Sequence, residues 1–319
     1  MVRSTNSLQK AGVQKTLAAR VVLDGFGVHS GKPASVTLHP ADADSGVVFV
    51  RADGAGELVP ATFRSVAATE LCTILSGRDG ATIATVEHLM AALSALEVDN
   101  VLVEVDGPEM PILDGSAAAF VAAIDAVGLA SQGRGRSVLR VLKPVRVDQG
   151  DAFGELEPWP SRRFEVTIDF DTPLIGRQSI GFELAPRFFR EEMARARTFG
   201  RVADVERLWA AGYALGSSLE NSVAIADDRV LNPDGLRWSD EFVRHKALDA
   251  VGDLALAGLP IVGLYRSYKG GHRINVSVLK ALFADESAYE IVEAPSRRES
   301  GHAEIAAGLA AAAFGPDRG

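Results

Sequence analysis

Short apolar runs separated by turn residues fill the first part of the chain. These runs contain β-branched side chains and end at Asp, Gly, Pro or Ser, which is typical of strands. They predict strands over 21–23, 35–39, 47–51 and 101–105.

Residues 85–97 have a helical spacing instead. Their apolar positions recur every three or four residues and are Val86, Leu89, Met90, Leu93 and Leu96. This period predicts a helix with one buried face, and Thr85 is placed to cap it through its side chain. A similar pattern predicts a second helix over 116–127.

The segment 129–137 contains Gly, Arg and Ser and separates a helix from new strand-like runs, so it is the best linker candidate. We therefore expect one domain over 1–130, a second over 137–294, and a charged, then Ala-rich tail over 295–319 that is partly loose. In the second domain we expect strands over 138–147, 164–170, 222–226 and 261–268, and helices over 186–196, 202–211, around 244–253 and around 279–283. Strands plus two helices in each half predict an α+β fold of two domains, each with helices packed on a sheet.

Charge and cysteine content narrow the function classes. The net charge of −9 disfavours non-specific binding of nucleic acid, which needs a basic face. The single cysteine, Cys72, excludes a disulfide within the chain and a cysteine zinc cluster, which fits a reducing cytoplasm. We expect no integral membrane segment, because no apolar run reaches roughly 18 residues and the N-terminus has no apolar signal core.

His245 and Asp249 lie four residues apart in the helix expected around 244–253. This spacing puts an imidazole and a carboxylate on one helical face, where both reach one metal ion. His88 in the first helix is the best third ligand, although a single histidine in an apolar helix is also typical of a core residue. Asp253 continues the same stripe one turn later.

A set of two histidines and one aspartate leaves one tetrahedral position open, which is the pattern of catalytic zinc. Zn²⁺ suits these donors best, and Fe²⁺ is also compatible with them. Glu87, next to His88, is placed to take the proton of a water that such a metal activates. The sequence Gly270-Gly271-His272 would bring a general acid to the site edge, but alone it is more typical of a turn.

Six stretches carry a family resemblance. They are Thr-Val-Glu-His-Leu at 85–89, Pro-Ile-Leu-Asp-Gly-Ser-Ala at 111–117, Arg-Ala-Arg-Thr-Phe-Gly at 195–200, Val-Leu-Asn-Pro-Asp-Gly-Leu-Arg at 230–237, Phe-Val-Arg-His-Lys-Ala-Leu-Asp-Ala-Val-Gly-Asp at 242–253 and Gly-Gly-His at 270–272. Together they resemble the UDP-3-O-acyl-N-acetylglucosamine deacetylases, the zinc amidases of lipid A biosynthesis in Gram-negative bacteria. The resemblance covers roughly residues 14 to 290 and keeps the order of the motifs.

The resemblance implies roles for individual residues. It implies that His88, His245 and Asp249 bind zinc and that Glu87 is the general base. It also implies that His272 acts as acid or electrostatic stabiliser, that Asp253 orients it, and that Thr198 helps to hold the reacting carbonyl. By the same resemblance Lys246 and Lys269 lie near the sugar and the nucleotide phosphates. The remaining residues that we assign to substrate binding are Phe199, His29, Leu71 and Cys72.

The resemblance also implies an architecture and a reaction. The helices of the two domains would meet between their sheets, as a sheet-helix-sheet sandwich, and an insert over about 199–221 would pass the acyl chain. A monomer would bind the UDP-linked acylated amino sugar and hydrolyse its N-acetyl group, releasing acetate. The chain departs from the family at Ala152, which stands where other members have a lysine near the nucleotide.

Two other functions stay open. One is a zinc amidohydrolase that acts on another acylated amino sugar. The other is a two-domain binding protein with a structural metal, which requires a closed site of four ligands. The chain offers no cysteine pair and no fourth nearby histidine for such a site.

Overall fold

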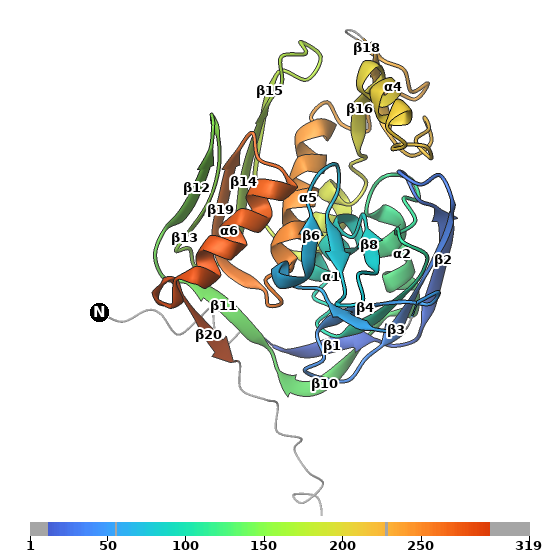
Figure 1. Cartoon of the computed structure of the whole chain (residues 1–319). Helices are drawn as coiled ribbons and strands as arrows, with labels where there is room; N and C mark the ends of the chain where they lie inside the picture. Colours follow the sequence, from blue (N-terminus) through green and yellow to red (C-terminus); the bar gives the residue numbers. More distant parts are fainter. Residues whose placement is uncertain (1–11, 55, 227–228, 294–319) are drawn as a thin grey trace, which may run out of the picture.

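Two sheets enclose a central layer of helices in the computed structural model, which describes residues 12–54, 56–226 and 229–293 (Figure 1). The first sheet contains, in spatial order, β2 (Val21–Phe26), β3 (Pro33–Pro40), β9 (Val101–Asp106), β4 (Val47–Arg51) and β5 (Leu58–Pro60). Neighbouring strands are antiparallel except β4 and β9, which run parallel. The strands expected in this region are therefore confirmed, whereas the short β5 was not predicted.

A second, smaller sheet and two helices complete the first part. The sheet contains β6 (Val66–Ala68), β7 (Ile74–Ser76) and β8 (Thr82–Ala84), and the helices are α1 (Glu87–Ala95) and α2 (Ala118–Val127). The prediction that Thr85 caps α1 is wrong, since α1 has no side-chain cap and its N-cap residue is Val86. Thr85 instead has a φ of 64°, in the left-handed region that is unfavourable for a β-branched residue. Its hydroxyl donates to Glu109 Oε1 at 3.4 Å.

The large sheet of the second part is built around one long strand. In spatial order it contains β12 (Val145–Gln149), β13 (Ala152–Glu157), β19 (Ile261–Tyr268), β11 (Ser137–Val141) and β20 (Tyr289–Glu293), and β19 also pairs with β14 (Arg162–Asp169), which pairs with β15 (Arg177–Glu183). Its helices are α5 (Glu241–Ala255) and α6 (His272–Ala284). The final helix expected to contain 279–283 is thus confirmed as α6, which begins at His272.

A further group of elements lies between β15 and α5. They are α3 (Pro186–Phe188) with the π-helical turn Phe189–Met193, then β16 (Phe199–Arg201), α4 (Val202–Ala210), β17 (Val223–Ala226) and β18 (Arg229–Val230). Strands β16, β17 and β18 form a separate small sheet. Together with α4, this sheet forms a lobe beside the first part of the chain (Figure 1). The insert expected over about 199–221 falls in this lobe.

The segment 129–137 is not the irregular linker that its composition predicted. Most of it forms β10 (Leu129–Gly135), which pairs antiparallel with β1 (Val13–Leu17) in a two-stranded ribbon. Backbone pairing with β1 offsets the weak strand propensity of its glycines, a tertiary effect that local composition does not contain. We propose that this ribbon marks the boundary between domains 1–130 and 137–294. The tail 295–319 lies outside the described residues.

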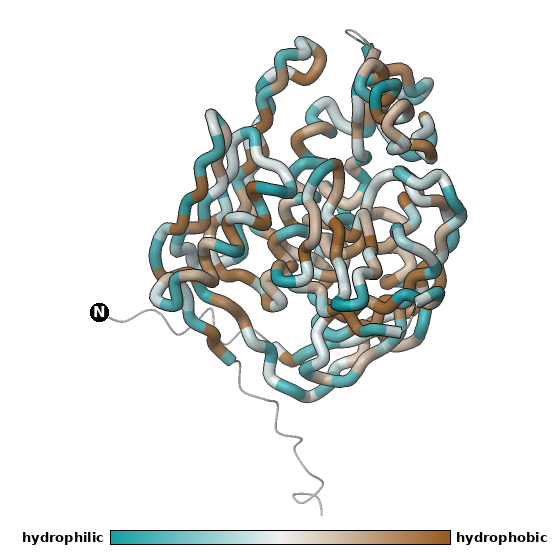
Figure 2. The backbone as a smooth tube through the Cα atoms, in the orientation of Figure 1, coloured by the Kyte–Doolittle hydropathy of each residue, from teal (hydrophilic) through white to brown (hydrophobic). Residues whose placement is uncertain are grey.

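Helices α1 and α5 cross at the centre of the molecule, between the two sheets (Figure 1). Leu89 and Leu93 of α1 and Leu248 and Val251 of α5 belong to one continuous buried cluster that contains residues of both sheets. In Figure 2, many of the hydrophobic (brown) segments of the backbone accordingly lie toward the middle of the molecule. This arrangement confirms the α+β fold and the layering of sheet, helices and sheet.

The crossing requires a glycine. A Cβ built at Gly252 of α5 would lie 2.0 Å from the carbonyl oxygen of Glu87 and 3.1 Å from the amide nitrogen of Ala91. Glycine inside a helix costs about 1 kcal/mol relative to alanine. Its presence here is therefore explained by the close approach of the two helix backbones.

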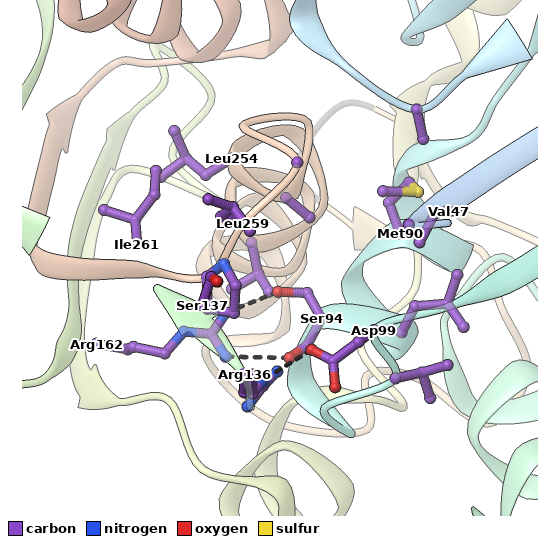
Figure 3. Close-up of a pocket in the computed structure, with 18 of the residues that line it drawn as sticks. Val47, Met90, Ser94, Asp99, Arg136, Ser137, Arg162, Leu254, Leu259 and Ile261 are labelled. Carbon is purple, nitrogen blue, oxygen red and sulfur yellow. Dashed lines mark hydrogen bonds and ion pairs between the residues drawn. The ribbon is translucent and has the colours of Figure 1, made fainter. Parts of the chain in front are cut away.

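Polar contacts between the first and second parts of the chain lie near the C-terminal end of α1 (Figure 3). Arg162 of β14 donates to the carbonyl oxygen of Ser94 at 3.1 Å and to its hydroxyl at 2.7 Å. Ser94 is in the last turn of α1, whose carbonyls lack helical partners and attract a cation. Arg136 nearby donates to Asp99 at 2.6 Å. These contacts hold the end of α1 against the second sheet.

Within the described residues, none of the helices combines the length and the apolar character needed to cross a membrane.

Candidate active site

Helices α1 and α5 bring the three predicted metal ligands together. One ligand atom from each of His88, His245 and Asp249 lies within 4.8 Å of the others. Asp249 Oδ1 is 3.6 Å from His88 Nε2 and 3.4 Å from His245 Nε2. All three residues are at least 95% buried. The structure therefore assembles the three residues as candidate ligands, two from one helix and one from the other.

The surroundings orient these donor atoms. His245 Nδ1 donates to the carbonyl oxygen of Ala196 at 3.0 Å, so that Nε2 carries the lone pair that faces Asp249. Asp249 Oδ2 accepts from Lys246 Nζ at 2.7 Å. Asp249 Oδ1 is buried and has no hydrogen-bond partner among the described residues. Because an unpaired buried carboxylate oxygen is costly, its position between two imidazoles fits a divalent cation.

The charge states also fit metal binding. Burial lowers the pKa of His245 to about 4 although Asp249 opposes the shift, so the imidazole is neutral near pH 7. Burial alone would raise the pKa of Asp249, but the facing His245 and Lys246 hold it well below its usual range. A neutral imidazole and an ionised carboxylate are the protonation states that ligands need.

Glu87 lies beside the ligand set and is almost fully buried. Its Oε2 accepts the backbone N–H of Thr73 at 3.1 Å, and its Oε1 is 3.9 Å from His272 Nε2. Burial raises the pKa of Glu87, whereas the positive potential of His272 and His88 opposes this shift. A carboxylate with a raised pKa accepts a proton more readily near neutral pH.

His272 at the start of α6 faces Glu87 from the second domain. Its Nδ1 is 2.8 Å from Asp253 Oδ2, and Asp253 is fully buried. Burial alone would lower the pKa of His272, but the charge and hydrogen bond of Asp253 outweigh burial and raise it to about 9. His272 is therefore protonated at neutral pH.

A cavity of about 330 Å³ opens above these groups. Of the predicted catalytic, metal-binding and substrate-binding residues, it is lined by His29, Leu71, Cys72, Glu87, His88, Thr198, Phe199, His245, Lys246, Asp249 and His272. The lobe formed by the insert adds half-buried apolar side chains, among them Val205 and Leu208 of α4. The cavity therefore joins a polar floor to a partly apolar wall.

Two of the predicted residues do not line this cavity. Asp253 does not line the cavity itself but contacts His272, which does. Lys269, just after β19, has a φ of 52°, and its Nζ forms an exposed contact at 2.7 Å with Asp151 Oδ2 in the turn between β12 and β13. In this arrangement Lys269 is engaged with a carboxylate outside the cavity.

Two residues of the first domain that line the cavity, His29 and Cys72, have different surroundings. His29 is half-buried, and burial lowers its pKa despite the nearby Glu109. Its Nδ1 has no hydrogen-bond partner among the described residues. Burial raises the pKa of the Cys72 thiol, which is therefore an unreactive wall residue rather than a nucleophile.

Thr73 and Asn275, which we had not predicted, form hydrogen bonds with the carboxylates of the site. Thr73 contacts both Glu87 and Asp253, and Asn275 Nδ2 donates to Asp253 Oδ2 at 2.7 Å. The side chain of Asn275 in turn accepts from Tyr265. Asn275 lies three residues after His272, one helical turn along α6, and this spacing is the one signal in the sequence that points to it.

A buried ion pair holds the loop that carries Thr198. Arg197 Nε donates to Glu241 Oε1 at 2.8 Å, and Glu241 is fully buried. Glu241 also accepts the backbone N–H groups of Arg197 and Arg237. The same loop supplies the Ala196 carbonyl that orients His245. Residues of the motifs at 195–200 and 230–237 thus fix the position of this loop.

The motif at 111–117 joins the lobe to the first domain. The carbonyl oxygen of Gly115 accepts the backbone N–H of Thr198 at 2.8 Å. Gly115 has a φ of 78°, and a Cβ there would lie 1.8 Å from the carbonyl oxygen of Asn221. Only glycine permits this contact without movement of the backbone.

Comparison with known proteins gives one consistent family. Residues 14–284 match the family model described as LpxC, UDP-3-O-acyl N-acetylglycosamine deacetylase. Proteins of Brucella ovis, Brucella canis and Brucella abortus (strain S19), each named UDP-3-O-acyl-N-acetylglucosamine deacetylase, are 56% identical to this chain over 283 residues. Each alignment covers 88% of this chain and 99% of the relative. The chain therefore belongs to the UDP-3-O-acyl N-acetylglycosamine deacetylase family.

Proposed function

We propose that this chain hydrolyses the N-acetyl group of UDP-3-O-acyl-N-acetylglucosamine, releasing acetate and a free amine in the biosynthesis of lipid A. The observation that carries the proposal is the buried set of His88, His245 and Asp249, with Glu87 beside it at the floor of the cavity. The names of the relatives favour this reaction over the two alternatives raised from the sequence.

His88, His245 and Asp249 would hold a divalent cation through the two Nε2 atoms and Oδ1. Zn²⁺ suits two imidazoles and one carboxylate best, and Fe²⁺ remains compatible by ligand type. When bound, the cation would polarise the amide carbonyl and lower the pKa of a neighbouring water. Lys246 keeps Asp249 ionised and oriented through its contact with Oδ2.

Glu87 is the general base in this proposal. Its Oε2 is fixed by the Thr73 amide, which leaves Oε1 directed toward His272 and available for a proton from the attacking water. The raised pKa of Glu87 supports proton acceptance near neutral pH, and the same carboxyl can then return the proton to the leaving amine.

His272 and Thr198 stabilise the negative charge that develops on the carbonyl oxygen. His272 is protonated at neutral pH, and Asp253 fixes its ring through Nδ1 so that Nε2 faces Glu87. A preorganised cation in a buried site is worth far more than one in water, because it needs no reorientation during the reaction. Thr198 lines the same cavity.

The remaining assignments concern the substrate outside the reacting amide. We assign the apolar wall with Val205 and Leu208 to the acyl chain, and Phe199, His29, Leu71 and Cys72 to the sugar and chain junction. Lys269 would bind the nucleotide phosphates once its ammonium group leaves Asp151 and pairs with a phosphate instead. Because Ala152 stands where other family members have a lysine, this region has one cation fewer, and phosphate binding would depend more strongly on Lys269.

Release of acetate from the UDP-linked acylated sugar tests the proposal. We expect zinc-loaded protein to release one acetate per sugar and the Glu87→Gln variant to retain zinc with little turnover. Release from other acylated amino sugars at a higher kcat/KM would reject the substrate assignment. The proposal includes a monomer in the cytoplasm, and light scattering of the purified protein tests the monomer.

A further inference from the structure

Thr73 contacts catalytic groups from both domains. It is fully buried in the loop that leads into β7. Its backbone N–H donates to Glu87 Oε2 at 3.1 Å, and its hydroxyl donates to Asp253 Oδ1 at 2.6 Å. Glu87 belongs to α1 and Asp253 to α5. One residue therefore holds the carboxylate proposed as base and the carboxylate that orients His272.

We propose that Thr73 is a positioning residue that sets the distance between Glu87 and the Asp253–His272 pair. The proposal rests on the deacetylase function, because it assigns no chemistry of its own to Thr73. The hydroxyl acts on His272 through Asp253, and the amide acts on Glu87 directly.

The hydrogen bonds of Asp253 explain why the hydroxyl matters. His272 Nδ1 and Asn275 Nδ2 both contact Oδ2, and both come from α6. In the part of the chain that the structure describes, Oδ1 has Thr73 as its one hydrogen-bond partner. Without this donor, a fully buried carboxylate oxygen would be unpaired, and rotation of the carboxylate would relieve the cost. Such a rotation moves the acceptor of His272 and therefore the imidazole.

The backbone of Thr73 also fixes the start of α1. Its carbonyl oxygen accepts the N–H of Thr85 at 3.1 Å. Thr85 has a φ of 64°, a conformation that persists only where surrounding contacts impose it. The turn into α1 carries Glu87 and His88, so Thr73 anchors the same segment through its carbonyl and through its amide.

Two substitutions separate the hydroxyl from the shape of the side chain. Thr73→Val keeps the β-branched shape and the backbone bonds but removes the donor, whereas Thr73→Ser keeps the donor. Thr16→Val is the matched control, because Thr16 is also a buried threonine of the first domain, with its hydroxyl bonded to the Ala41 amide far from the cavity. For each variant we would measure zinc content, kcat and KM for acetate release, and the proton spectrum of the His272 Nδ1–H.

For Thr73→Val we expect kcat to fall roughly 10- to 100-fold, as for other residues that orient catalytic groups. Full zinc content and a KM within about twofold should accompany this loss, together with a shifted or broadened His272 resonance. Thr73→Ser should restore most of kcat and the resonance, and Thr16→Val should keep both. Wild-type kcat in Thr73→Val, or equal losses in Thr73→Val and Thr73→Ser, would overturn the proposal. Failure of the wild-type protein itself to release acetate would instead reject the proposed function.

Discussion

Gly252 of α5 lies against Glu87 of α1 so closely that a Cβ would come within 2.0 Å of the Glu87 carbonyl oxygen. This contact sets the separation of the helices that carry His88, His245 and Asp249. The geometry of the candidate metal site therefore depends on a residue that donates no atom to it.

We expect Gly252→Ala to lower both stability and metal affinity. The intrinsic preference of a helix for alanine would stabilise the variant by about 1 kcal/mol, but overpacking against backbone typically costs about 1–3 kcal/mol and prevails here. Thermal unfolding and zinc titration check this. Gly181→Ala is the control, since a Cβ there meets its nearest atom at 3.5 Å. Equal zinc affinity in Gly252→Ala and the wild type would contradict the account.

Glu87→Gln should lower kcat about 100-fold or more, because general base catalysis contributes about 10²–10⁴-fold. The amide oxygen can still accept the Thr73 N–H, so we expect the fold and the zinc content to be kept. Steady-state acetate release and metal analysis on the same sample measure both. A variant with normal turnover would show that another group takes the proton.

The rate should fall as the pH rises through about 9, because His272 then loses its proton. Its pKa in the folded chain lies above its ordinary value of 6.5, so its contribution to stability is complete below about pH 6.5 and is lost as the pH rises through about 9. Asp253→Asn removes the charge that raises this pKa and should move the alkaline limb of kcat to lower pH. An unmoved limb in Asp253→Asn would assign it to another group.

Loss of the buried ion pair should loosen the loop at 195–200. Arg197→Met leaves Glu241 buried and uncompensated, which typically costs about 3–5 kcal/mol. We also expect kcat to fall, because the loop positions Thr198 and the Ala196 carbonyl. Arg187→Met is the control, since its contact with Glu191 is exposed and should contribute little. Chemical denaturation gives the free energy of unfolding of Arg197→Met and Arg187→Met. Equal values for the two variants would argue against a stabilising role of the Arg197–Glu241 pair.

The sequence predicts the elements whose signal is local. Apolar patterning identifies α1 and all strands of the first sheet except β5, and the spacing of His245 and Asp249 identifies two of the three candidate ligands. The family resemblance assigns His272 and Asp253 to one site with Glu87, and in the structure His272 lies 2.8 Å from Asp253 and 3.9 Å from Glu87.

Other features depend on contacts that no local pattern contains. Thr73 is an isolated polar residue before a three-residue strand, and its two acceptors lie 14 and 180 positions away. The helical pattern around Lys246 does not show that its ammonium group contacts Asp249 beside the cavity. The ribbon of β1 and β10 pairs segments more than a hundred residues apart, which is why composition alone predicted a linker there.

The central claim is that His88, His245 and Asp249 bind the catalytic metal. The most direct measurement is the zinc content and acetate release of wild-type protein and His88→Ala, each purified without added metal and then titrated with Zn²⁺. The account predicts one zinc per wild-type chain with activity that follows occupancy, and His88→Ala with weakened binding and little activity at saturation. Stoichiometric zinc and full activity in His88→Ala would contradict it.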